Sequence, residues 1–254
     1  MRTLFILLIL VAFESHSQSY TVIHIIGKIY NTESGSYLTK GSKVSENSSL
    51  KFESDGARAA VLSSSRGRFV IQKNAAASSQ SDALYALSSV ISPVRGRLST
   101  RAGAINNSLD FQKYFNEGTV ALIGNEYEVK VSPEAYPISD SKFFYAQYQL
   151  GEETINKKLR GESGKLNINL TDFFSVDGNP IDASAIKEVK LYYYDTEEQK
   201  SAFITDMNIS YIPEEELKSL VDQFPDDKEA MLEVINSLYG KCTEEQLSKA
   251  IEDL

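Results

Sequence analysis

The stretch EYEVKV at residues 126–131 alternates polar and apolar side chains, so Tyr127, Val129 and Val131 share one face. The stretch KLNINL at residues 165–170 repeats this pattern, with leucine or isoleucine at every second position. Successive side chains of a β-strand point to opposite faces of its sheet. Both stretches are therefore predicted to be strands with one buried face.

Five further runs of similar length lie around these two. The seven predicted strands cover residues 119–123, 126–131, 142–150, 153–160, 165–170, 188–194 and 202–212. Seven short strands within residues 119–212 predict an immunoglobulin-like β-sandwich. The cysteine pair and the tryptophan that mark antibody domains are absent, so the prediction concerns the architecture alone.

Upstream, residues 18–73 are dense in shorter extended runs that are separated by turn residues. Asp55 and Gly56 lie between two of these runs and predict a hairpin turn, because glycine adopts a positive φ at little steric cost. We therefore expect a small, mostly antiparallel β-roll in this part of the chain.

The segment from residue 74 to residue 118 differs in composition and predicts a linker rich in Ala, Ser and Arg. One helix is expected within it, at about residues 81–90. The reason is that Leu84, Leu87 and Ile91 recur at helical spacing.

From residue 213 to residue 254 the apolar period becomes helical and predicts a compact, acidic helical tail. Three helices are expected, and Thr243 and Gln246 form a capping box at the start of the third. The first helix carries an apolar stripe that is a candidate docking surface for a partner protein. The stripe consists of Leu217, Leu220, Val221 and Phe224.

Residues 1–17 have the pattern of a signal peptide, with Arg2 near the start and a ten-residue apolar run at residues 4–13. We expect cleavage after Ser17 and an extracytoplasmic mature protein, either periplasmic or secreted. The apolar run is half of the roughly 20 residues that a membrane-spanning helix needs, so no transmembrane anchor is expected in the mature chain. The single cysteine, Cys242, cannot form an intramolecular disulfide, so the core must stabilise the fold.

The net charge of −9 is distributed unevenly along the chain. Residues 195–254 contain 16 acidic and 5 basic residues (net −11), whereas residues 18–194 contain 18 acidic and 20 basic ones (net +2). This balance disfavours general attraction to nucleic acid.

Basic residues gather between residues 58 and 101, where six arginines form a candidate basic surface. They are Arg58, Arg66, Arg68, Arg95, Arg97 and Arg101. Clustered arginines bind phosphate or carboxylate groups, which predicts an anionic envelope polymer, nucleic acid or an acidic partner as the ligand. Two other interpretations stay open: the arginines dock against the acidic tail, or they are scattered and solvated.

Residues that usually carry catalysis are scarce. After cleavage the only histidine is His24, and its position between Val22 and Ile26 in a predicted strand favours a structural role over that of a base. Zinc sites usually draw on several His or Cys ligands, and the chain has no nucleotide-binding motif, so neither a metal nor another cofactor is expected.

Two tyrosines, Tyr192 and Tyr194, are predicted to share the face of a strand. They form either an exposed aromatic pair that binds a ligand or ordinary cross-strand packing.

Glycines and aliphatic residues follow a rhythm within residues 18–73. It consists of GKI at 27–29, LTKGSKV at 38–44, LKF at 50–52, AAVL at 59–62 and GRFVI at 67–71. This rhythm resembles the FecR-type extracytoplasmic β-domain, in which short strands wind into a compact roll. FecR proteins relay envelope signals through a membrane segment to a cytoplasmic region, and neither part is expected here. The resemblance therefore implies an extracytoplasmic β-module and assigns no functional residue.

Together these features predict a non-catalytic envelope protein that binds a partner protein or an anionic envelope polymer. An alternative is an adaptor that acts through its acidic C-terminal helices. A third is a hydrolase that uses paired carboxylates, because acidic residues are plentiful and their spacing depends on the fold. The sequence predicts neither the identity of the ligand nor the oligomeric state.

Overall fold

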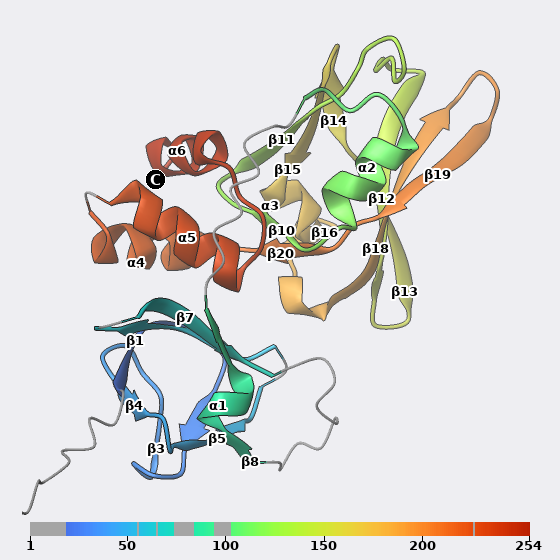
Figure 1. Ribbon diagram of the computed structural model, residues 1–254. Helices are drawn as coiled ribbons and strands as arrows, with labels where there is room; N and C mark the ends of the chain where they lie inside the picture. The colour runs from blue at the N-terminus through green and yellow to red at the C-terminus, as the bar shows by residue number, and fades with distance from the viewer. Residues whose placement is uncertain (1–18, 55, 65, 74–83, 94–102, 226) are drawn as a thin grey trace, which may run out of the picture. The chain divides into compact units, whose positions relative to one another are not determined.

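The computed structural model describes residues 19–54, 56–64, 66–73, 84–93, 103–225 and 227–254 (Figure 1). The predicted signal peptide lies outside these residues. The chain divides into an N-terminal unit that ends at Pro93 and a C-terminal unit that begins at Val94. As predicted, the protein is mainly β with helices at its C-terminal end.

The N-terminal unit contains two small antiparallel sheets. The first has the order β4 (Lys43–Ser45), β1 (Ser19–Ile26), β6 (Arg58–Ser63), β7 (Gly67–Gln72) and β9 (Ile91–Pro93). The second has the order β3 (Ser36–Tyr37), β2 (Ile29–Asn31), β5 (Ser49–Phe52) and β8 (Leu84–Ala86), and the short helix α1 (Leu87–Val90) follows β8.

Both sheets bury side chains in one core. Val22 and Val61 from the first sheet pack in the same cluster as Ile29 and Leu50 from the second. The alternation of apolar and polar residues places these side chains on the inner faces. The expected small antiparallel β-domain therefore forms, and it extends past residue 73 to Pro93.

Two local predictions for this unit are wrong. The strands β5 and β6, which flank residues 55–56, do not form the expected hairpin because they belong to different sheets, and Asp55 itself lies outside the described residues. The helix expected at residues 81–90 is restricted to α1 among the described residues, because residues 84–86 pair with β5 as β8. A short apolar run can form either a helix or a strand, and here pairing of residues 84–86 with β5 decides for a strand.

The C-terminal unit contains two larger sheets. The first is antiparallel, with the order β13 (Glu153–Lys158), β12 (Lys142–Leu150), β18 (Ile186–Asp195) and β19 (Lys200–Asp206). The second is also antiparallel, with the order β11 (Glu126–Lys130), β15 (Lys165–Asn169) and β14 (Arg160–Glu162). Separately, β10 (Val120–Leu122) pairs in parallel with β20 (Ile209–Tyr211).

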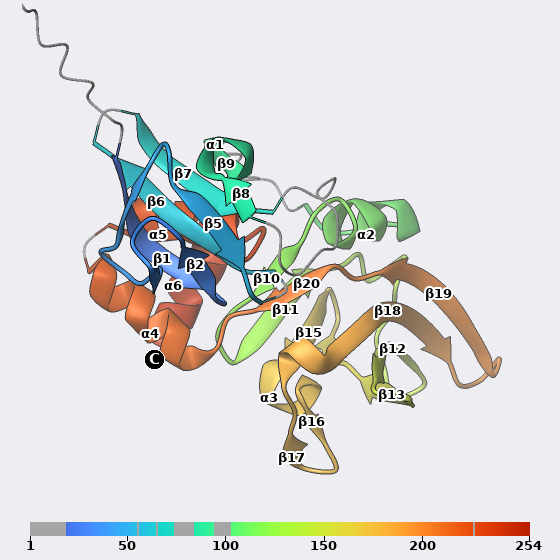
Figure 2. The same ribbon diagram turned by 90° about the horizontal axis from the view of Figure 1, so that it is seen from below.

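Shorter elements connect these strands. They are α2 (Ser108–Phe115), α3 (Leu170–Phe173), the β16–β17 hairpin (Ser175–Val176 and Asn179–Pro180) and a 3₁₀ turn (Ala183–Ala185). The β16–β17 hairpin stands next to α3 (Figure 2).

One hydrophobic core lies between the two sheets. Phe144 and Tyr148 of β12 pack in the same cluster as Tyr127 of β11 and Ile168 of β15, and Phe111 of α2 joins them. Two antiparallel sheets on one core give the sandwich-like arrangement that the sequence predicts.

The structure differs from the prediction in three elements of this unit. The strand expected at residues 153–160 ends at Lys158, and Arg160 begins β14 in the other sheet. The strand expected at residues 202–212 is two strands, β19 and β20, because Met207 bonds back to Val189 and Asn208 to Phe115 at the break. The segment read as a linker up to residue 118 contains α2, which the sequence reading missed.

The helical tail forms as predicted, with α4 (Glu214–Gln223), α5 (Lys228–Leu238) and α6 (Glu244–Glu252). The side chain of Thr243 accepts from the N–H of Gln246, and the side chain of Gln246 accepts from the N–H of Thr243, so the predicted capping box is present. Within the described part of the chain, every helix is too short or too polar to cross a membrane.

Candidate functional site

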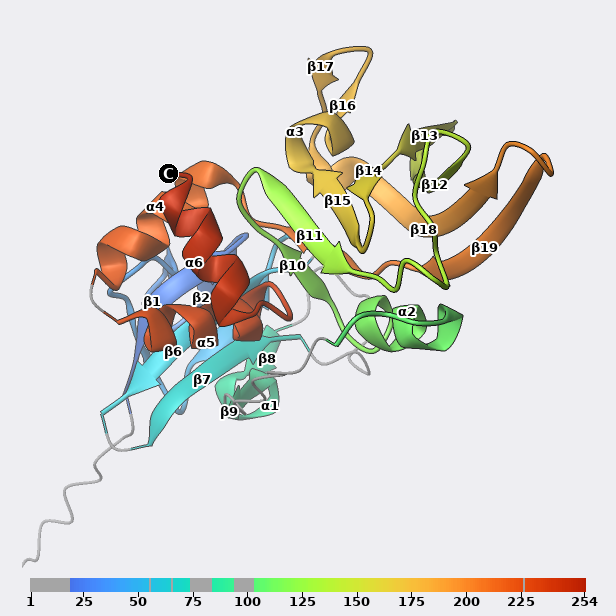
Figure 3. The ribbon, with the colours of Figure 1, turned by 90° about the horizontal axis from the view of Figure 1, so that it is seen from above.

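A cleft of about 770 Å³ lies in the C-terminal unit between β11 and the helices α5 and α6. Figure 3 shows β11 with β15 on one side and α6 on the other. We call it the β11–α6 cleft; Glu126, Glu128 and Lys130 line its strand wall, and Leu232, Glu245 and Gln246 line its helix wall. Its volume falls in the range of ligand pockets.

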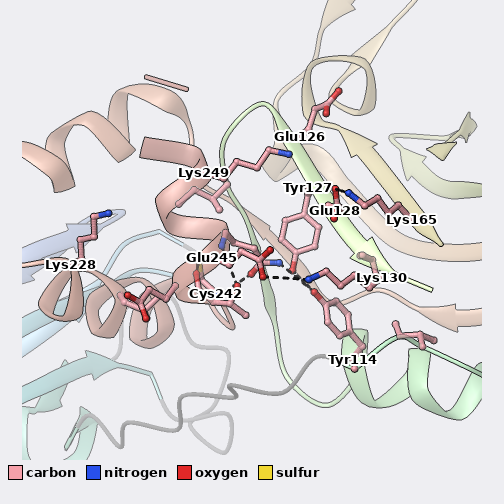
Figure 4. A pocket seen from close by; sticks show the side chains of 18 of the residues that line it. Tyr114, Glu126, Tyr127, Glu128, Lys130, Lys165, Lys228, Cys242, Glu245 and Lys249 are labelled. Atoms are coloured by element: carbon pink, nitrogen blue, oxygen red, sulfur yellow. Dashed lines mark hydrogen bonds and ion pairs between the residues drawn. The ribbon is translucent and has the colours of Figure 1, made fainter. Parts of the chain in front are cut away.

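The floor of the cleft is a pair of tyrosines that point toward one another (Figure 4). The hydroxyls of Tyr114 on α2 and Tyr127 on β11 share a hydrogen bond of 2.8 Å. The side-chain amide of Gln246 donates to the Tyr114 hydroxyl at 3.4 Å. Burial raises the pKa of Tyr114 and raises that of Tyr127 well above its usual range, so both hydroxyls stay protonated. The floor is therefore neutral and couples α2, β11 and α6.

Cys242 also lines the cleft, but the residue is only 6% exposed. Burial raises the pKa of its thiol to about 12. The thiolate is the nucleophilic form of cysteine, so this thiol is unsuited to nucleophilic catalysis at neutral pH.

We expect Cys242 to resist a thiol reagent such as DTNB in the native protein at pH 8 and to react on unfolding in urea. At that pH a pKa of about 12 leaves roughly one thiol in ten thousand ionised, against about one in ten at a pKa of 9. Because the folded pKa is raised, the stability from the protonated thiol is complete below about pH 9 and is lost as the pH rises toward 12. The Cys242→Ser variant is the blank, and rapid native labelling would contradict the buried position.

Charged side chains of both signs form the rim of the cleft. Lys130 pairs with Glu245 across the cleft at 3.5 Å, and Lys165 pairs with Glu128 at 3.2 Å (Figure 4). The lining contains five glutamates, at positions 126, 128, 229, 244 and 245, and four lysines, at positions 130, 165, 228 and 249. Since residues 195–254 have a net charge of −11, the helix side of the cleft belongs to an acidic part of the chain.

Of the six arginines in the predicted basic surface, the structure describes Arg58, Arg66 and Arg68. Arg58 and Arg68 lie on β6 and β7, where Arg58 is opposite Gln72 and Arg68 is opposite Leu62. Four residue steps along a strand separate them by about 13 Å. Arg66 lies 4.0 Å from Glu46. The other three members, Arg95, Arg97 and Arg101, lie outside the described residues.

The predicted docking stripe of α4 is not an exposed surface. Leu217 and Leu220 are buried, while Val221 and Phe224 are half-buried. A short helix gains most of its stability by burying its apolar side, which is the physical reason for this correction.

The predicted aromatic pair lies on the outer face of β18, where the ring geometry supports cross-strand packing. Tyr192 stacks on Tyr145 of β12 with ring centroids 5.0 Å apart, and Tyr194 packs against Phe143 at 5.5 Å. His24, the other residue singled out in the sequence, is buried in β1.

Sequence reasoning missed the residues that form the cleft. The capping box identified Gln246 as a helix-start residue, but its contact with Tyr114 depends on the tertiary fold. The alternation in β11 predicted that Tyr127 is buried. It did not predict that the Tyr127 hydroxyl bonds to Tyr114 of α2.

A scan against protein-family models, a search of curated proteins and a search of solved structures each found no match. Within the described ranges, no group of three or more His, Cys, Asp or Glu side chains could hold a metal ion.

Proposed function

We propose that this chain is a non-catalytic, extracytoplasmic binding protein that receives a basic segment of a partner protein in the β11–α6 cleft. The observation that carries the proposal is the cleft itself, with its neutral tyrosine floor and its charged rim. The volume of the cleft falls in the range of ligand pockets, and its nine charged lining side chains can orient a charged ligand.

The charge of the surrounding chain supports a basic ligand. The cleft lining itself has five glutamates and four lysines, but the helix wall belongs to residues 195–254, whose net charge of −11 favours a positively charged segment over an anionic polymer. The described arginines, at positions 58, 66 and 68, are not among the residues that line this cleft, so the polymer alternative would need a different surface. The signal-peptide pattern of residues 1–17 supports an extracytoplasmic location.

A selection from a phage-displayed library of random 12-residue peptides tests the proposal, with residues 18–254 as the target. We expect peptides rich in Lys and Arg to be enriched and to bind less tightly as salt increases. The Glu245→Trp variant places a large side chain at the mouth of the cleft and should weaken binding of the selected peptides by about tenfold or more.

The matched control is Glu252→Trp, the same change at an exposed position of α6 that does not line the cleft. It should leave binding unchanged. If the two variants bind alike, or if no basic peptide is enriched, this function is wrong.

A further inference from the structure

We infer that the basic segment binds as an added β-strand along the edge of β11, an inference that rests on the proposed function and specifies how the cleft is occupied. The three-stranded sheet has the order β11, β15, β14, so β11 is an edge strand with one side unpaired by any strand of that sheet. Exposed strand edges present N–H and C=O groups that pair with extended peptides.

The register of β11 shows which backbone groups face the cleft. The N–H of Val131 donates to Gly164, and the carbonyl of Asn125 accepts from Leu170, so the odd-numbered residues bond toward β15. In an antiparallel strand the next residue points its N–H and C=O to the opposite side. The backbone groups of Glu126 and Glu128 therefore point away from β15.

The next even-numbered residue of β11 already uses this edge. The carbonyl of Lys130 accepts from the N–H of Ile105 at 2.9 Å, and Ile105 forms a parallel bridge with Val131. The Ile105 contact shows that this edge of β11 can pair with another segment of backbone. It also occupies the C-terminal end of the edge, so an added strand must bind before it.

Contacts at both ends limit the length of an added strand. A Cβ on Gly124 would lie 3.0 Å from the Cβ of Ala250, so α6 closes the cleft just before β11. The Lys130–Glu245 ion pair crosses the cleft at the other end. The part of the edge inside these limits, from Glu126 to Lys130, spans about 13 Å and accommodates four or five extended residues.

The side chains of β11 define the chemistry of the added segment. Residues of a neighbouring strand that lie beside Glu126 and Glu128 share their face, where a basic side chain would meet the Glu126 carboxylate and compete with Lys165 for that of Glu128. Residues at the alternate positions share the face of Tyr127 and Val129, both buried in the core cluster, and these should be apolar. The structure thus assigns to this edge an extended peptide with basic and apolar residues in alternation.

The test uses the tightest peptide from the library and two variants of residue 128. Both Glu128→Pro and Glu128→Ala remove the carboxylate that pairs with Lys165, but only proline removes the N–H that faces the cleft. Glu128→Pro leaves the hydrogen bonds from the odd-numbered residues to β15 in place, because proline is tolerated where the replaced N–H points away from the neighbouring strand. We expect the proline variant to bind the peptide about tenfold or more weakly than the alanine variant, measured by calorimetry.

A second measurement does not depend on how Glu128→Pro folds. Single N-methylation along the peptide should abolish binding to the unmodified protein at every second residue, because only alternate amides face β11. If methylation shows no period of two, strand addition is overturned. If Glu245→Trp still blocks the peptide in that case, the proposed function survives, whereas a selection that enriches no peptide overturns both.

Discussion

The Phe111→Ala variant should lose about 3–5 kcal/mol of unfolding free energy, measured by urea denaturation. Phe111 is fully buried on α2, and its ring lies 5.4 Å from Phe144 and 5.3 Å from Tyr136 between ring centroids. Removing it leaves a cavity in the sandwich core that close-packed neighbours fill only partly. The loss would identify α2 as a part of the core.

The control is Leu109→Ala on the same helix. Leu109 is 55% exposed, so this substitution should change the unfolding free energy by less than about 0.5 kcal/mol. Equal losses in the two variants would contradict the packing of α2, because they would reflect helix propensity instead of burial.

The contrast between α2 and β12 explains how much of the fold the sequence predicts. The strand predicted at residues 142–150 is β12 with the same bounds, since its alternation extends over nine residues. Helix α2 has eight residues and lies in a segment that reads as a linker. Its local signal is the Asn107 side chain, which caps the N–H of Asp110. A single capping residue before a helix of two turns is a weaker sequence signal than an alternation of apolar and polar residues over nine positions.

Strand pairing explains the errors in the N-terminal unit. The spacing of Leu84, Leu87 and Ile91 fits a helix, yet Leu84 is opposite Lys51 and Ile91 is opposite Ile71 in the two sheets. Local spacing cannot show which distant strand is available for pairing. The same limit explains why the strands β5 and β6 belong to different sheets and form no hairpin.

The candidate site was less predictable than the fold because it joins distant segments. The sequence predicted both β11 and α6, but the ion pair between Lys130 and Glu245 exists only once the tail packs beside the strand. Charge counts along the chain identified the acidic tail but could not show that Glu126 and Glu128 lie on the opposite wall. Arginine clustering in the sequence likewise does not fix distances in space, since Arg58 and Arg68 lie four residue steps apart on the paired strands β6 and β7.

Gly240 connects α5 to the sandwich, and the Gly240→Ala variant should lose about 2–5 kcal/mol of unfolding free energy. Its φ of +125° disfavours any L side chain, and a Cβ there would lie 2.7 Å from the carbonyl carbon of Thr119. The next residue, Lys241, donates its N–H to that same Thr119 carbonyl at 2.7 Å and accepts from Ala121 at 2.9 Å. The added methyl group therefore presses on the hydrogen bonds that join the tail to β10. Urea denaturation measures the loss.

The matched control is Gly178→Ala, which isolates the steric part of this effect. Gly178 also has a positive φ, +79°, but a Cβ there would meet no atom within 4 Å. The Gly178→Ala variant should lose only about 1–2 kcal/mol of unfolding free energy, which is the cost of placing an L side chain at positive φ. Because Cys242 and Gln246, which line the cleft, lie two and six residues after Gly240, the Gly240 variant should also weaken peptide binding in the β11–α6 cleft, whereas the Gly178 variant should not. Equal losses of stability in the two variants, with peptide binding intact in both, would contradict a rigid junction between the tail and the sandwich.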